Sequence, residues 1–567
     1  MSIHHRRIPR LPERPRVHPV AERISRSYPV GRQSFSRAYR GEPLSLSLSA
    51  QDCFPDPLLV RLVTTLNSKA GNVWSHVPFK RIDDSLYTCR LIPDHSGVYS
   101  FHAEFSVDNG VTWLQDTVPD AWILIDPPQA KALRLYTLIP TVSGTIADWR
   151  SDLPRIRDLG FNAIHLLPIT PLGSSESPYA ARNLFDVDAN YLIPGSLADG
   201  LAQLEEFAEE AKALSIRLCF DLVLNHVAVD SEIARHAPDW IVPDQSRPDG
   251  LKRAGYWSGQ GWSTWEDLVL INYEHPAETA RQEIRAYMTD YALFWAKFAN
   301  DTGGFVRFDN LHSSDGAFIE QVSSALHAEF PELGILAEYF TDDRTLLESL
   351  PNWGLDLVLA TPWNYRWVPD LRGYLTYTHR QASQVRYFMP ITTHDSGTPA
   401  QEFGTAESTI PRYVVSALLG NGATGIVQGV EYGLKEKVEF IGVKERMNLQ
   451  ADQPYASIIR RINAILEEFE AFQGDGNMHF VDEGHAAILA AFRQDRTGQS
   501  AGFLVACNFD ISHPQRLTVD VSAYLGAEGS VKGVDLIGCD SVECVDGKVD
   551  VRLEPCDAWV VRFSPSE

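Results

Sequence analysis

The sequence predicts an α/β fold: a (β/α)8 barrel (TIM barrel) with an N-terminal β-sandwich, a small inserted subdomain after the third strand and a C-terminal all-β domain. Between residues 131 and 475, short apolar runs alternate with amphipathic stretches of helical period, the order expected of a parallel barrel. On both sides of this region, short alternating runs are separated by turn residues, which is typical of antiparallel sheets. The 567 residues also exceed one ordinary core and predict two to four domains.

The chain begins with a segment unlike the rest. Residues 1–40 are rich in arginine, histidine and proline, and we expect them to form a flexible basic arm. The arm lacks the apolar core of a signal peptide, and no stretch approaches the length of a membrane-spanning helix. Residues 41–130 then contain LLVRLVTTL, SLYTCRLI, GVYSFHAEFSVDNGVTW and AWILID, with a hairpin signal at Asp-Asn-Gly. This second pattern predicts the β-sandwich.

The barrel strands are expected at eight apolar runs. In chain order they are LRLYTLIP, NAIHLLP, RLCFDLVL, GFVRFDN, GILAEYF, LDLVLA, RYFMPITTHD and TGIVQGVEYG. Amphipathic helices such as 201–214 and 277–299 lie between most of them. Residues 227–275 are too long for a simple loop and predict the inserted subdomain. In residues 476–567, the runs HAAILAAFR, SAGFLVACNFD, QRLTVDV and DAWVVRFS predict the C-terminal β domain.

Composition restricts the partners of the chain. Lys and Arg number 50 against 74 Asp and Glu, and the resulting charge of −24 repels nucleic acid and anionic membranes. A neutral substrate is indifferent to this charge. The seven cysteines are scattered without CxxC spacing, so we expect reduced thiols and a cytoplasmic location.

Charged and polar side chains gather at the C-terminal ends of four predicted strands, where barrels of this kind place their active sites. They are Asp221, Asn225 and His226 after the third strand, Arg307, Asp309 and His312 after the fourth, Glu338 after the fifth, and His394 and Asp395 after the seventh. A lone aspartate after a strand is commonly a helix N-cap. That explanation is poor for the whole set, because its members end different strands on the same side of the barrel.

Asp309 and Glu338 suit retaining glycoside cleavage. In that reaction two carboxyl groups lie about 5 to 5.5 Å apart; one attacks the anomeric carbon and the other protonates the leaving oxygen. Adjacent parallel strands, about 4.8 Å apart, allow this spacing. Arg307 shares a strand face with Asp309 and is expected to lower its pKa and keep it ionised. Glu338 must start protonated, a state that a neighbouring carboxylate such as Asp395 favours.

Four segments in this order resemble the motifs of the α-amylase superfamily, glycoside hydrolase family 13. They are DLVLNH (221–226), VRFDNLH (306–312), LAEYF (336–340) and TTHD (392–395), and GIVQGVEYG (425–433) is similar to the eighth-strand segment of that family. The resemblance implies that Asp309 is the nucleophile and Glu338 the acid/base. It also implies that Asp395, His394 and His226 bind hydroxyls of the sugar at the cleavage site.

Other substrate-binding candidates are less specific. Arg307, Asp221 and His312 belong to the same motifs. Tyr179, in SPYAAR, resembles the tyrosine that stacks beneath the reacting sugar in the family; the alternative is an ordinary core or loop tyrosine. The tryptophans of the predicted insert, Trp240, Trp257, Trp262 and Trp265, either stack on sugar rings or fill the small core of the insert, and we favour the second role for most of them.

A closer likeness is to the glucanotransferase half of eukaryotic glycogen debranching enzyme. It rests on residues 161–185, on DNLHSS, on AEYFT and on SLYTCRLIPDHSGVYSF ahead of the barrel. A second catalytic half is absent, so an α-1,6-glucosidase step is not expected. Thr393 stands where hydrolases of the family often have Asn, which leaves the acceptor open. There is also a likeness to bacterial maltosyltransferases that use maltose 1-phosphate, although no clear phosphate cradle is visible.

We therefore expect a retaining enzyme that cleaves α-1,4 bonds of an α-glucan or maltooligosaccharide by double displacement, with 4-α-glucanotransfer favoured. The alternatives are an amylase-type hydrolase, a maltosyltransferase using maltose 1-phosphate, and a non-catalytic carbohydrate-binding protein on the same fold. The last class typically lacks the nucleophile or the acid, and this chain has both. No cofactor is expected to be required. Asn225 matches a calcium-ligating position of many relatives, but a full set of oxygen ligands is missing, so the metal stays open.

Overall fold

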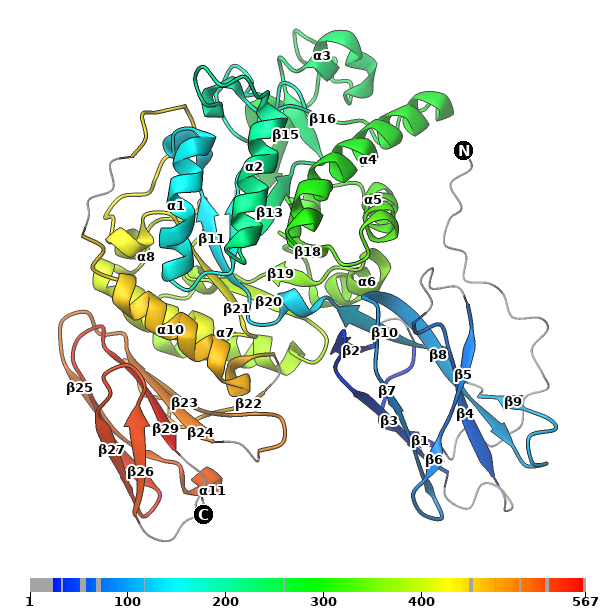
Figure 1. Cartoon of the computed structure of the whole chain (residues 1–567), viewed down its shortest axis with the longest axis vertical. Helices are drawn as coiled ribbons and strands as arrows, with labels where there is room; N and C mark the ends of the chain where they lie inside the picture. The colour runs from blue at the N-terminus through cyan, green and yellow to red at the C-terminus, as the bar shows by residue number, and fades with distance from the viewer. Residues whose placement is uncertain are drawn as a thin grey trace. The chain divides into compact units, whose positions relative to one another are not determined.

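A computed structural model of the chain describes residues 24–31, 34–50, 58–67, 73–116, 118–257, 261–447, 452–474, 476–498, 501–525 and 530–563. Two compact units are present. The first consists of Met1–Pro128, Ser323–Gly334 and Thr341–Asp356, and the second of Gln129–Val322, Ile335–Phe340 and Leu357–Glu567. Figure 1 follows the elements of both from blue to red.

The first unit contains two β-sheets. One has the strand order β1 (Ser25–Arg26), β3 (Leu44–Ser49), β7 (Leu86–Leu91) and β6 (Lys80–Arg81). The other has the order β2 (Ser36–Tyr39), β10 (Ala121–Asp126), β8 (Gly97–Ser106), β4 (Leu59–Thr64) and β5 (Ser75–Pro78), with β9 (Leu114–Gln115) on β8. Side chains of both sheets, such as Leu46 and Phe101, share one apolar core. The predicted N-terminal β-sandwich is confirmed.

The N-terminal sheets begin earlier than the sequence pattern indicates. Strands β1 and β2 lie inside the predicted basic arm of residues 1–40, of which residues 1–23 are outside the described residues. Arg37 in β2 forms a buried ion pair with Asp126 in β10, with 2.6 Å between Nη2 and Oδ1. At least one basic residue of this segment, Arg37, is therefore a buried strand residue whose charge is neutralised within the sheet.

Eight parallel strands form a closed barrel in the second unit, in the order of the chain (Figure 1). They are β11 (Arg134–Leu138), β12 (Ala163–Leu166), β13 (Arg217–Leu222), β17 (Phe305–Phe308), β18 (Gly334–Ala337), β19 (Leu357–Leu359), β20 (Tyr387–Pro390) and β21 (Ala423–Val427). β21 pairs with β11 and closes the barrel. Each strand lies in one of the predicted runs, because strands covered on both faces read as continuous apolar sequence. The predicted barrel is confirmed.

Helices follow the strands along the chain. They are α1 (Ile146–Asp158), α2 (Gly200–Ala213), α4 (Glu278–Asp301), α5 (Gly316–Glu329), α6 (Asp343–Trp353), α7 (Val368–Gln381), α8 (Pro399–Phe403), α9 (Thr409–Leu418) and α10 (Ala456–Glu468). α1 starts at a capping box of Thr145 and Asp148. Its buried Trp149 packs against Phe207 of α2, with ring centroids 6.1 Å apart. The predicted helices at 201–214 and 277–299 correspond to α2 and α4.

The predicted insert after the third barrel strand is a small sheet. Its strand order is β14 (His226–Ala228), β16 (Trp262–Leu270) and β15 (Arg253–Trp257), all antiparallel, and helix α3 (Glu232–His236) lies between β14 and β15 in the chain. His226 is the first residue of β14 and pairs with Leu270. The insert therefore fixes one of the candidate site residues.

The C-terminal region is one sheet of eight strands, shown in orange to red in Figure 1. Its order is β22 (Asn477–Phe480), β23 (Ile488–Gln494), β24 (Gly502–Asn508), β29 (Ala558–Phe563), β26 (Ser530–Asp535), β27 (Ser541–Val545), β28 (Lys548–Leu553) and β25 (Gln515–Asp520), and α11 (Ser522–Leu525) follows β25 in the chain. Arg372 of α7 pairs with Asp482 before β23 at 3.0 Å. The predicted C-terminal β domain is confirmed.

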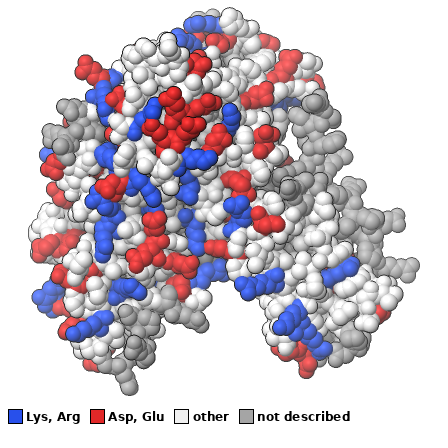
Figure 2. Space-filling model, viewed as in Figure 1, with Lys and Arg blue, Asp and Glu red and all other residues white. Residues whose placement is uncertain are grey.

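The surface carries both signs of charge. On the face shown in Figure 2, acidic and basic side chains are interspersed, although the whole sequence has a net charge of −24. None of the helices in the described ranges is long and apolar enough to cross a membrane.

Candidate active site

The predicted site residues do meet at the C-terminal ends of the barrel strands. Asp221 and Arg307 are paired in register on β13 and β17. Asp309 follows β17 directly, and Glu338 follows β18 directly. His394 lies in the loop after β20. The barrel topology therefore brings side chains that are far apart in sequence to one mouth.

Arg307 is the common partner of three carboxylates. Its Nη1 donates to both oxygens of Asp221 at 2.7 Å each, and to Oδ1 of Asp309 at 3.1 Å. Its Nη2 donates to Oε2 of Glu338 at 2.7 Å. The Arg307 side chain is only 5% exposed. Because charge-assisted hydrogen bonds are strong and directional, this one guanidinium sets the positions of all three carboxylates.

The carboxylates differ in acidity. Burial raises the pKa of Asp221, but the charge of Arg307 and the hydrogen bonds from His165 and Arg307 lower it more, so its pKa lies below the ordinary value. Burial raises the pKa of Asp309 well above its ordinary value; Glu338 and Asp221 add to this rise, and Arg307 opposes it. Arg307 lowers the pKa of Asp309 as expected, but burial and the neighbouring carboxylates outweigh it, so the expected net lowering is wrong.

Tyr179 contacts this cluster through its hydroxyl and also packs against a small apolar core that includes Ile139 and Leu167. Its hydroxyl donates to Oδ2 of Asp221 at 2.9 Å and lies 2.7 Å from Nε2 of His394. The two rings are nearly parallel, with centroids 5.5 Å apart. Since the tyrosine proton goes to Asp221, His394 donates from Nε2. Burial lowers the pKa of His394 to about 3, and the charge of Arg307 acts in the same direction, so His394 is neutral at pH 7.

His165 is a site residue that the sequence reasoning missed. It lies in β12, is 3% exposed, and its Nε2 is 3.2 Å from Oδ2 of Asp221. Its Nδ1 is 3.3 Å from Oγ1 of Thr137. Burial lowers the pKa of His165, which therefore acts as a neutral hydrogen-bond partner. The available signal was a single histidine inside the apolar run NAIHLLP.

His226 reaches the mouth from the insert. Its Nδ1 contacts Oδ1 of Asn225, and its Nε2 is buried without a hydrogen-bond partner among the described residues. Burial lowers its pKa to about 4. The backbone of Tyr179 and the charge of Asp267 oppose this lowering, which places His226 beside Tyr179 of the cluster. The ring centroid of Trp265 lies 6.3 Å away.

Two predicted residues lie at the rim. Asp395 has a side chain that is 56% exposed; its Oδ2 is 3.2 Å from Nε2 of His394, and Lys437 donates to its backbone carbonyl at 2.9 Å. His312 is exposed, with its ring 5.4 Å from that of Phe340. Within the described part of the chain, neither side chain forms a hydrogen bond or ion pair with Arg307. His312 lies beside the central cluster, whereas Asp395 is close enough to it for the charge of Arg307 to lower its pKa against the larger raising effect of burial.

The insert tryptophans divide into different environments. Trp240 packs on Tyr287, with centroids 5.5 Å apart, and Trp265 stacks on Tyr256 at 5.0 Å, as packing residues do. Trp262 is 55% exposed. The side chain of Trp257 lies outside the described residues.

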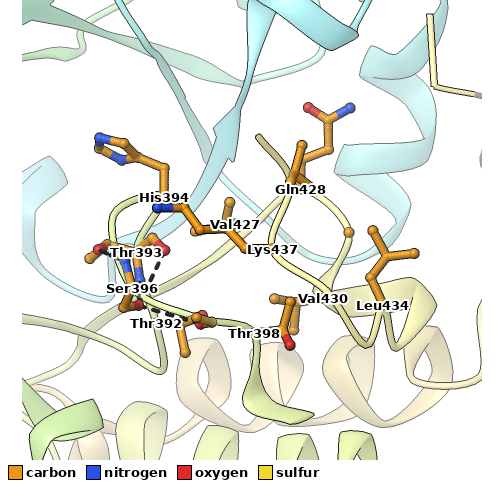
Figure 3. Close-up of a pocket in the computed structure, with 13 residues that line it drawn as sticks. Thr392, Thr393, His394, Ser396, Thr398, Val427, Gln428, Val430, Leu434 and Lys437 are labelled. Atoms are coloured by element: carbon orange, nitrogen blue, oxygen red, sulfur yellow. Dashed lines mark hydrogen bonds between the residues drawn. The ribbon is translucent and has the colours of Figure 1, made fainter. Parts of the chain in front are cut away.

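Two hollows adjoin His394. The first is lined by His165, Arg307, Thr393, His394 and Asp395, together with apolar side chains of the barrel strands. The second lies on the side of β21 and is drawn in Figure 3, where the side chain of Lys437 extends toward the loop of Thr392–Ser396. Ser396 is hydrogen-bonded to Thr393 there, which holds the loop in shape.

Metal ligation is not indicated around this cluster. Within the described ranges, no group of three or more His, Cys, Asp or Glu side chains is arranged to hold a metal ion. Asn225, the calcium-type position of the sequence comparison, directs Oδ1 toward His226.

Comparison with known proteins links this architecture to α-glucan enzymes. Residues 128–247 match the family model described as the glucanotransferase domain of glycogen debranching enzyme. The chain is 23% identical over 410 residues to an alpha-1,4-glucan:maltose-1-phosphate maltosyltransferase of Arcanobacterium haemolyticum, covering 67% of this chain and 56% of the relative. It is 25% identical over 419 residues to a protein of the same name from Salinibacter ruber, covering 65% and 58%. The chain thus spans less than two thirds of the length of these relatives.

Solved structures share the fold. A cyclomaltodextrinase superposes with a TM-score of 0.62 at 15% identity, over 96% of this chain and all of that one (100%). A maltogenic α-amylase from Thermotoga neapolitana superposes with a TM-score of 0.62 at 17% identity, over 77% and 99% of the two chains. These superpositions agree with the barrel and its flanking β regions.

Proposed function

We propose that this chain, a protein of the α-amylase family (glycoside hydrolase family 13), is a retaining transglycosylase that transfers a maltosyl unit from maltose 1-phosphate to an α-glucan. The observation that carries the reaction class is the grouping of Asp309 and Glu338 around one buried guanidinium. The donor is inferred from the maltosyltransferase relatives. Those relatives favour the maltosyltransferase alternative over the 4-α-glucanotransfer that the sequence led us to favour.

In the proposed first step, Asp309 attacks the anomeric carbon as the bond to the departing oxygen breaks, and a β-glycosyl ester of Asp309 forms. Glu338 gives its proton to that oxygen. Arg307 contacts both carboxylates and keeps them on the same side of the barrel mouth. In this role it also offsets the negative charge that shifts between them during the reaction.

In the proposed second step, Glu338 takes the proton from a sugar hydroxyl of the acceptor, which attacks the ester from the opposite face and restores the α configuration. His226 and His394 are neutral hydrogen-bond partners for hydroxyls of the bound sugar, because burial lowers the pKa of each. The steps use side-chain carboxylates and do not themselves require a cofactor.

A single assay separates the candidate functions. We expect maltose 1-phosphate with maltopentaose to release inorganic phosphate and to give products lengthened by two glucose units, resolved by size. A second candidate, 4-α-glucanotransfer, is favoured by the match of residues 128–247 to the debranching-enzyme model. It predicts shorter and longer chains from maltopentaose alone. Only shorter chains, with reducing ends rising in step, would identify a hydrolase and contradict transfer.

The pH profile should report the unusual acidity of the nucleophile. Protonated Asp309 cannot attack, and its raised pKa means that the proton is retained at a higher pH than on an ordinary aspartate. We therefore expect kcat/KM to fall on the acid side with an apparent pKa above about 4, the ordinary aspartate value, since kcat/KM reports the free enzyme. α-Maltosyl fluoride is the suitable substrate, because its leaving group needs no proton. An acid limb at or below pH of about 4 in a folded protein would show that Arg307 controls the ionisation of Asp309.

A further inference from the structure

Asn310, next to the proposed nucleophile, has an unusual backbone. Its φ is 45° and its ψ is 46°, the left-handed region that residues with a Cβ rarely occupy. The residue is 8% exposed and lies at the turn between β17 and the short helix η6 (Leu311–Ser313). A strained conformation next to reacting groups persists only where the surrounding structure enforces it.

The backbone of this turn is hydrogen-bonded to Glu338. The backbone N–H of Asn310 donates to Oε2 of Glu338 at 3.0 Å. The N–H of Leu311 donates to the backbone carbonyl of Glu338 at 2.9 Å, and the N–H of Glu338 donates to the carbonyl of Phe308 at 3.0 Å. The segment after β17 therefore binds both the main chain and the side chain of Glu338. Rotation of residue 310 to an extended conformation would redirect its N–H away from Oε2.

The side chain of Asn310 takes no part in these contacts. Its Nδ2 is buried without a hydrogen-bond partner among the residues described. The contribution of Asn310 to Glu338 is thus made by the backbone. Asparagine fits this purpose because it enters the left-handed region at less cost than most residues with a Cβ.

Both donors to the carboxylate meet the same oxygen. Arg307 Nη2, at 2.7 Å, and the N–H of Asn310 bind Oε2. Oε2 is thereby occupied as an acceptor, and the proton that a general acid carries belongs on the other oxygen, Oε1.

We propose that Asn310 is a positioning residue: its left-handed turn aims the backbone N–H that fixes Oε2 of Glu338 and so turns Oε1 toward the departing and accepting oxygens. This inference rests on the proposed function, in which Glu338 is the acid/base. It goes beyond that proposal by assigning the orientation of Glu338 to the backbone conformation of one residue.

The test compares Asn310→Ala with Asn310→Gly, because glycine adopts the left-handed turn without strain and alanine does not. Each variant is assayed on maltose 1-phosphate and maltopentaose, whose departing oxygens take a proton, and on α-maltosyl fluoride, whose fluoride takes none. We expect Asn310→Ala to lower kcat/KM on the first two donors about tenfold or more, and to change the fluoride rate by less than about threefold. Asn310→Gly should keep all rates within about threefold of the parent.

Three results would overturn the inference. Equal losses in the alanine and glycine variants would assign the effect to the missing amide side chain. Equal losses on activated and unactivated donors, with a lowered Tm, would indicate a structural role alone. Parent-like rates for Asn310→Ala on every donor would show that the turn does not orient Glu338. Failure of the parent to form a covalent intermediate on Asp309 from the fluoride, seen by mass spectrometry, would contradict the proposed function instead.

Discussion

Asp309→Asn is expected to remove turnover by about a thousandfold or more while leaving the fold intact. The amide has nearly the same shape but does not form the glycosyl ester. Asp309 is buried and has a raised pKa, so exchange for a neutral group removes the cost of burying a charge, and we expect an unchanged or higher Tm. The measurements are kcat/KM on α-maltosyl fluoride, circular dichroism and thermal unfolding.

The matched control is Asp301→Asn, at the exposed end of α4, which should leave both rate and Tm unchanged. A folded Asp309→Asn protein that keeps more than a few per cent of the parent rate would refute Asp309 as the nucleophile. Deamidation of Asn to Asp restores activity slowly, so the assay should be completed on freshly prepared protein.

Glu338→Gln is expected to separate donors by their leaving groups. Without the acid, cleavage of maltose 1-phosphate or maltopentaose should slow by about a hundredfold or more, because general acid catalysis contributes about that much, whereas formation of the intermediate from α-maltosyl fluoride should change little. The ester intermediate then breaks down slowly, because no general base removes the proton of the acceptor hydroxyl. A nucleophile without such a proton does not need the base. Azide should therefore accelerate the reaction with the fluoride and give α-maltosyl azide.

The configuration of the azide product checks both assignments together. Azide that attacks a β-glycosyl ester on Asp309 yields the α product, so the Glu338 variant should retain configuration. In Asp309→Gly, azide instead replaces the missing carboxylate and should give β-maltosyl azide. Equal losses on all donors without an azide product would exclude Glu338 as the acid/base.

The barrel could be predicted from sequence because its strands are covered on both faces and read as unbroken apolar runs. The C-terminal sheet was predicted less completely. Its strands β26, β27 and β28 alternate exposed and buried side chains, as in SVECV (541–545), and such short half-polar runs resemble loops. In the N-terminal segment, a charged residue was predicted to be exposed and is buried. The partner of Arg37, Asp126, is 89 positions away in the sequence, so the pair could not be predicted from the local pattern.

The candidate site was predictable where a charged residue ends a strand. Asp309, Glu338 and Arg307 could be placed at one mouth, because the strand order of a barrel fixes which strand ends meet. His165 was missed because one histidine in an apolar strand is commonly a core residue. The net rise in the pKa of Asp309 could not be foreseen from the spacing of Arg307 and Asp309 alone. It depends first on the burial of Asp309 at the barrel mouth and then on the neighbouring carboxylates of Glu338 and Asp221, which together outweigh the charge of Arg307.

His226 is part of both the candidate site and the insert sheet. It lines the mouth of the barrel, and it is also the first residue of the insert sheet, paired with Leu270. Whenever that small sheet opens, the mouth loses one of its hydrogen-bonding groups, even though the barrel stays folded. A bound sugar that uses His226 adds its binding energy to the free energy of opening the sheet. Substrate affinity and the local stability of the insert are therefore linked. Sequence changes in β15, which pairs with β16 and not with β14, can alter substrate affinity by changing the stability of the sheet.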